Sequence, residues 1–119
     1  MPSLGPGRIF WAIAPGKRGG GKRRPMIVVN RGFDINRDRR VVAVVCSTDF
    51  AEPLGPAEVL LPSDPDGRVR TRLRSPTVAV CDWKIAFDAD AIIPDEGMVT
   101  SALLREIRDR AGLSYGPER

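Results

Sequence analysis

The segment Val41-Val42-Ala43-Val44-Val45-Cys46 carries the strongest strand signal in this 119-residue chain. Five of its six residues are valine or alanine and four are β-branched, which is typical of a strand that packs on a pleated surface. A polar segment, 30–40, precedes it and has the composition of a turn-rich connection. We therefore expect a strand over 41–46 and a sheet arranged around it.

Other strands are predicted on both sides of this segment. They are rich in β-branched or aromatic residues and bounded by proline and glycine. Pro25 suits the first position of a strand because it has no amide hydrogen, and the continuously apolar residues after it predict a strand buried on both faces. The predicted strands are 8–14, 26–29, 57–61 and 77–81, with a further extended piece over 83–87.

Only the last part of the chain has helical periodicity. Apolar residues recur at helical spacing and charged residues occupy the other side, which predicts one amphipathic helix. Thr100 or Ser101 can cap it, and Gly112 can end it. The apolar positions are Leu103, Leu104, Ile107 and Ala111. The predicted fold class is therefore mainly β (α+β): a small β-barrel with a C-terminal helix packed on its side.

The composition fits one ordinary globular domain over residues 1–119, with flexible ends at 1–7 and 114–119. The longest apolar runs are far shorter than the ~20 residues that span a bilayer. The N-terminus lacks the features of a secretory signal. We expect a cytoplasmic protein with no membrane partner.

The chain has two cysteines and no histidine. Cys46 and Cys81 both lie in valine-rich runs, which favours buried thiols in adjacent strands over a disulfide. Without histidine, and with so few cysteines, most zinc, haem and iron–sulfur sites are excluded, as are Ser-His-Asp and Cys-His catalysis. We expect no metal and no cofactor, and any enzyme here must work with Arg, Lys, Ser, Thr, Tyr, Asp and Glu.

A basic, glycine-rich segment precedes Pro25. Residues 17–24 (Lys-Arg-Gly-Gly-Gly-Lys-Arg-Arg) hold five cations, whereas the net charge of the whole chain is only +4. The three glycines leave room for a bulky polyanion to approach. This segment predicts a nucleic-acid contact, with a solvated hairpin tip as the alternative. The four cations that precede Arg24 are Lys17, Arg18, Lys22 and Arg23.

Two further features are candidates for nucleic-acid contact. Arg70, Arg72 and Arg74 alternate along the chain, which would place them on one face of a strand, either as a second contact with the nucleic-acid backbone or as the outside of an edge strand guarded against aggregation. Trp83 is a candidate platform for base stacking. For Trp83, as for Trp11, packing in the core or at an interface is the alternative.

The order and spacing of several motifs resemble the MazF/PemK toxin family. The segment Gly7-Arg-Ile-Phe-Trp11 resembles the family's G-[DE]-[IV]-[VW]-W start, Arg24-Pro25-Met-Ile-Val-Val29 its R-P-V-[LV]-[VI] strand, and Val44-Val-Cys-Ser-Thr48 its third strand. Segment 73–82 resembles the family's S-x-[VA]-x-x-[DE]-Q-[IV] strand, and segment 97–113 its C-terminal helix. The likeness therefore runs over nearly the whole chain.

The resemblance implies an SH3-like barrel of the PemK/CcdB type, usually a homodimer. It also implies a sequence-specific endoribonuclease that cleaves single-stranded RNA without a metal, leaving 2′,3′-cyclic phosphate and 5′-hydroxyl ends. Such a toxin has a small antitoxin protein as its partner. The family's essential arginine falls on Arg24, and its hydroxyl residue falls on Ser47, or on Thr48 if the register slips by one.

The chain departs from the family pattern at three places. It has no carboxylate between Gly5 and Asp34, where many members carry an acidic residue, and this leaves open slower cleavage or a member that has lost activity. The family's [DE]-Q pair reads Asp82-Trp83, and no proline precedes the hydroxyl residue. A non-catalytic alternative is a CcdB-like module that binds a protein such as DNA gyrase through residues 105–115.

Overall fold

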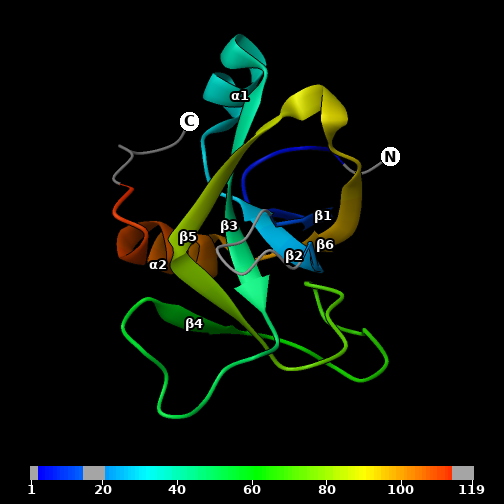
Figure 1. Ribbon diagram of the computed structural model, residues 1–119. Helices are drawn as coiled ribbons and strands as arrows, with labels where there is room; N and C mark the ends of the chain where they lie inside the picture. Colours follow the sequence, from blue (N-terminus) through cyan, green and yellow to red (C-terminus); the bar gives the residue numbers. More distant parts are fainter. Residues whose placement is uncertain (1–2, 15–20, 114–119) are drawn as a thin grey trace.

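The computed structural model describes residues 3–14 and 21–113 of the chain (Figure 1). Within these residues, six strands form one antiparallel sheet in the order β4-β5-β3-β2-β1-β6. The strands are β1 Arg8–Ile13, β2 Arg23–Val28, β3 Arg40–Ser47, β4 Glu58–Leu61, β5 Thr77–Asp88 and β6 Pro94–Met98. The helices are α1 Gly32–Asp38, α2 Ser101–Arg110 and a short 3-10 helix, η1 Ala89–Ala91. The predicted mainly β fold with a C-terminal helix is confirmed.

The central strands β2 and β3 are buried on both faces, as their apolar sequences predict. Successive side chains of a strand point to opposite faces, so each strand contributes to two cores. Ile27 and Val44 belong to a helix-side core that α2 covers with Leu104 and Ile107. The opposite face carries a tryptophan-side core, against which Trp83 packs. It is built from Phe10, Ala14, Met26, Val28, Ile35, Val41, Ala43, Val45 and Ala89.

The long strand β5 runs past both halves of β3. Its first residues pair with β4 and with the end of β3, and its last residues pair with the start of β3. The register between β3 and β5 shifts between Val44 and Val45, which marks an irregularity in the ladder. The two predicted segments 77–81 and 83–87 are therefore one strand.

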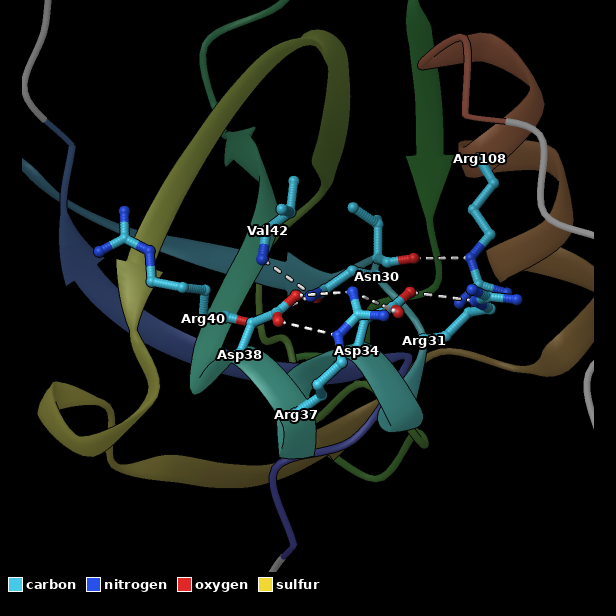
Figure 2. Close-up of polar contacts among 9 residues, drawn as sticks. Asn30, Arg31, Asp34, Arg37, Asp38, Arg40, Val42 and Arg108 are labelled. Carbon is cyan, nitrogen blue, oxygen red and sulfur yellow. Dashed lines mark hydrogen bonds and ion pairs between the residues drawn. The ribbon is translucent and has the colours of Figure 1, made fainter.

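Helix α1 replaces part of the turn-rich connection predicted over 30–40. The buried side chain of Asn30 joins the two ends of this segment: its Nδ2 donates to the Arg40 carbonyl and its Oδ1 accepts from the Val42 amide, each at 3.0 Å. Figure 2 shows these contacts beside the ion pair of Arg31 with Asp34 at 3.0 Å. One apolar residue of the helix, Ile35, is buried.

The alternating arginines at 70, 72 and 74 do not form a strand, so that prediction is wrong. The chain turns at Arg72, whose φ is +61°. The turn is fixed because Thr71 Oγ1 donates to the Pro62 carbonyl at 2.6 Å and the Met98 amide donates to the Arg70 carbonyl at 3.0 Å. The second of these bonds comes from β6, a strand that the sequence did not predict.

Helix α2 begins and ends as predicted. The Thr100 side chain accepts a hydrogen bond from the Leu103 amide at 3.2 Å, and Gly112 follows the helix with φ +74°. Cys46 in β3 and Cys81 in β5 are buried free thiols in neighbouring strands, also as predicted. In the described part of the chain, no helix has the length and apolar character needed to cross a membrane.

Candidate active site

Arg24 and Ser47 meet across the pair β2–β3. Met26 lies opposite Val45 in this antiparallel pair, so two residues further along, Arg24 lies opposite Ser47. Arg24 Nη1 donates a hydrogen bond to Ser47 Oγ at 3.1 Å. Arg24 is half-buried and Ser47 is 7% exposed. The two residues that the resemblance assigned to catalysis are therefore in direct contact.

The Ser47 hydroxyl is also held by the chain that follows it. The Asp49 amide donates to Ser47 Oγ at 3.0 Å, and Ser47 Oγ donates in turn to the Asp49 carbonyl at 3.4 Å. A hydroxyl has two lone pairs and one proton. The Arg24 guanidinium and the Asp49 amide therefore occupy both lone pairs, and the single proton is directed to the Asp49 carbonyl, so this hydroxyl is not suited to take up a further proton.

Asp49 is a site residue that the sequence reasoning missed. Its contribution comes from the backbone, through the turn in which a serine hydroxyl binds the amide two residues later. Serine and threonine form such turns often, so Ser47-Thr48-Asp49 at the end of a strand was a usable signal. Thr48, the alternative to Ser47, is exposed beyond the end of β3 and makes no hydrogen bond with Arg24.

Trp83 lies beside Arg24. The guanidinium carbon of Arg24 is 5.4 Å from the centroid of the Trp83 ring, within the range of a cation–π contact. Trp83 is half-buried and packs against the tryptophan-side core. Strand β5 therefore adds a third residue to the contact formed by β2 and β3.

The predicted RNA-binding cations fall in two places. Arg23 and Lys22 are exposed immediately before Arg24, and Lys17 and Arg18 lie outside the described residues. The other three predicted cations are exposed on the loop between β4 and β5, and none of them forms a hydrogen bond with Arg24 or Ser47. They are Arg70, Arg72 and Arg74. Arg72 pairs with Glu96 at 4.0 Å. Arg70 and Arg72 line a surface hollow with Arg68 and Glu96, and Arg74 follows on the same loop.

The ionisable groups with clearly perturbed pKa values lie outside this contact. Burial raises the pKa of Cys81 to about 11 and raises that of Cys46 still further. Among residues 3–14 and 21–113, no three His, Cys, Asp or Glu side chains are grouped so that they could hold a metal ion.

Comparisons with known proteins find similarity in structure and none in sequence. No protein-family model matches the chain, and no curated protein matches it. MazF from Deinococcus radiodurans superposes with a TM-score of 0.68 and 21% identity, over 92% of this chain and 93% of that one. The Mycobacterium tuberculosis toxin MazF-mt6 gives a TM-score of 0.63 and 18% identity, over 91% and 99%.

A third solved structure is an endoribonuclease from a mycobacterial species in complex with its cognate antitoxin. It gives a TM-score of 0.66 and 21% identity, over 96% of this chain and 100% of that one. At these identities, the likeness concerns the fold. It covers nearly the full length of each chain. The chain therefore has the fold of the MazF toxins.

Proposed function

We propose that this protein is an endoribonuclease toxin that cleaves single-stranded RNA at specific sequences without a metal ion. The observation that carries the proposal is the 3.1 Å hydrogen bond from Arg24 Nη1 to Ser47 Oγ at the ends of two neighbouring strands. The fold adds support, since solved proteins with this fold include mycobacterial endoribonucleases.

RNA supplies its own nucleophile. The 2′-hydroxyl loses its proton and attacks the adjacent phosphorus. The bond from phosphorus to the 5′-oxygen breaks, and this leaving oxygen takes up a proton. The products are a 2′,3′-cyclic phosphate and a 5′-hydroxyl. The protein must hold the reacting atoms in line and stabilise the charge that grows on the non-bridging oxygens.

Arg24 suits this task because its guanidinium stays charged and can hold two phosphate oxygens at once. With Nη1 directed at Ser47, the edge formed by Nε and Nη2 donates to no protein acceptor within the residues that the structure describes. This edge is available to a phosphate. The Ser47 hydroxyl orients Arg24. Its proton makes only a long 3.4 Å hydrogen bond to the Asp49 carbonyl and is proposed to turn to a phosphate oxygen when RNA binds.

The exposed cations Lys22 and Arg23, with Lys17 and Arg18 before them, are proposed to hold the RNA backbone next to Arg24. Contacts of this kind release counterions, so binding weakens steeply with salt. Arg70, Arg72 and Arg74 are proposed as a second contact with the backbone, made from the loop between β4 and β5. In this proposal the substrate is cytoplasmic RNA.

Two protein partners are part of the same proposal. The first is a small antitoxin, by analogy with the MazE–MazF complex from Deinococcus radiodurans and the mycobacterial endoribonuclease with its antitoxin. The second is a further copy of this chain. Trp11 and Ile13 on β1 are 40% and 58% exposed, and an exposed apolar pair on a sheet favours association.

The test uses purified protein, a long unstructured RNA and EDTA. Discrete fragments are expected, and sequencing of the 5′-hydroxyl ends identifies the cut site. Arg24→Ala should abolish cleavage without changing the circular dichroism spectrum or the melting temperature by more than a few degrees, and Arg105→Ala on the exposed side of α2 is the matched control. Intact RNA after incubation with folded protein contradicts the proposal, as do DNA breaks that precede RNA fragments in cells.

A further inference from the structure

We infer that Trp83 is the residue that positions Arg24 for phosphate binding. This inference rests on the proposed nuclease function and deepens it. The sequence indicated a choice between packing and base stacking for Trp83. The contact with Arg24 gives this tryptophan a third role, because the indole ring lies against the guanidinium that is proposed to hold the scissile phosphate.

The guanidinium of Arg24 is fixed from two directions. Nη1 is held by Ser47 Oγ at 3.1 Å, and the group lies over the Trp83 ring, 5.4 Å from its centroid. A hydrogen bond alone leaves rotation about the N–H···O axis free. A second contact, with the indole ring of Trp83, restricts that rotation. The Nε–Nη2 edge then points in one direction before RNA arrives.

Trp83 can act as a fixed surface because the core anchors it. Its side chain packs against the tryptophan-side core, as do the side chains of Ile85 and Phe87 on the same face of β5. Phe87 makes a T-shaped contact with Phe10 of β1, with ring centroids 5.4 Å apart. A ring held in this way presents the same face to Arg24 throughout the reaction.

Pre-ordering matters because an arginine side chain has many rotamers, and fixing one of them costs conformational entropy. If Trp83 only bound an RNA base, its loss would raise KM and leave kcat unchanged. If it positions Arg24, its loss lowers kcat, because the misplaced guanidinium stabilises the transition state less well. The kinetic parameter that changes therefore separates the two roles.

The first experiment compares Trp83→Phe, Trp83→Leu and wild type in cleavage of a short RNA that contains the mapped cut site. Trp83→Leu should lower kcat about fivefold to thirtyfold, with KM changed less than about threefold. Trp83→Phe, which keeps an aromatic face, should stay within about threefold of wild type. If Trp83→Leu does not fold, Trp83→Met takes its place.

Three kinetic results overturn the inference: an unchanged kcat in Trp83→Leu, a loss in Trp83→Phe as large as in Trp83→Leu, or a higher KM with kcat unchanged. The last result assigns Trp83 to base binding.

A second experiment needs no cleavage. The chain has two tryptophans, so Trp11→Phe leaves Trp83 as the only tryptophan, whose emission can be excited selectively at wavelengths where tyrosine does not absorb. In this background Arg24→Met should shift the Trp83 emission, whereas Arg23→Met, one residue earlier and on the opposite face of β2, should not. Equal emission in both variants overturns the inference. If wild type cuts no RNA, the proposed function fails, and the emission measurement alone decides whether Arg24 lies on Trp83.

Discussion

Arg108 Nε donates a hydrogen bond to the carbonyl oxygen of Val29 at 2.7 Å (Figure 2). Arg108 belongs to α2 and is 9% exposed, and Val29 directly follows β2. This contact ties the C-terminal helix to the strand whose other end carries Arg24. A charged side chain in the interior is stabilising only when its hydrogen bonds are satisfied.

Replacing Arg108 with methionine should lower the free energy of unfolding by about 1.5–3 kcal/mol, since a buried carbonyl loses a bond to a charged donor. Urea denaturation measures the change. Arg105→Met is the matched control, because Arg105 is exposed on the same helix, and it should change stability by less than about 0.5 kcal/mol. Equal effects of the two substitutions contradict this account.

Gly97 should tolerate no side chain. A Cβ added at this position would lie 2.1 Å from the carbonyl oxygen of Thr71, which is backbone and cannot swing aside. Gly97→Ala should therefore force β6 away from the loop and lower stability by about 3 kcal/mol. Gly5→Ala, with nothing within 4 Å of the new carbon, is the control. A melting temperature for Gly97→Ala within a degree or two of wild type would show that this packing is wrong.

Ser47 and Thr48 should differ sharply in cleavage. Ser47→Ala removes the oxygen that accepts from both Arg24 and Asp49, so kcat is expected to fall about a hundredfold. Thr48→Ala removes an exposed hydroxyl without a bond to Arg24, and we expect a loss of less than about threefold. Rates on the mapped RNA site measure both. The opposite ranking would move the hydroxyl role to Thr48.

The two buried thiols should make stability fall at alkaline pH. Burial raises the pKa of Cys81 to about 11 and that of Cys46 further, so the unfolded chain loses these protons first as pH rises above about 9. The thiols contribute fully to the free energy of unfolding at pH values below their pKa in the unfolded chain. This contribution is lost as pH rises toward their pKa in the folded protein. Each thiol should lower stability by about 1 kcal/mol between pH 8 and pH 10.

Urea midpoints at pH 8 and pH 10 test this dependence. The double variant Cys46→Ala, Cys81→Ala should lose most of it, whatever its stability at pH 8. A wild-type midpoint that is the same at both pH values contradicts the prediction.

The sequence predicted the elements that bury many apolar residues. The strand over Val41–Cys46 and the helix around Leu104 and Ile107 both follow from their hydrophobic pattern, because burial of these residues is what holds the elements in place. Helix α1 buries only Ile35 and depends on the distant bonds of Asn30, so no periodicity indicated it. Strand β6 contains proline and glycine, which are rare in strands.

For the candidate site, the family resemblance and the strand geometry together predicted the contact of Arg24 with Ser47, because this contact depends on two strands that pair directly. The contact of Arg24 with Trp83 depends on β5, whose register against β3 shifts next to the site. A shift of this kind changes which side chains face one another and has no signature in the hydrophobic pattern. The alternation of charge at 70–74 was misleading because it also lacks information on distant contacts. The turn at Arg72 depends on hydrogen bonds with Pro62 and Met98.

Strands β2 and β3 divide their side chains between two cores, so neither strand can separate from the sheet without opening both. Their amide protons should exchange with solvent only when the whole domain unfolds. Arg24 and Ser47 stand at the ends of these two strands. Substitutions in the surrounding loops can therefore change which molecules reach the guanidinium while its own position is kept, and this separation gives evolution a route to new ligands on an unchanged scaffold.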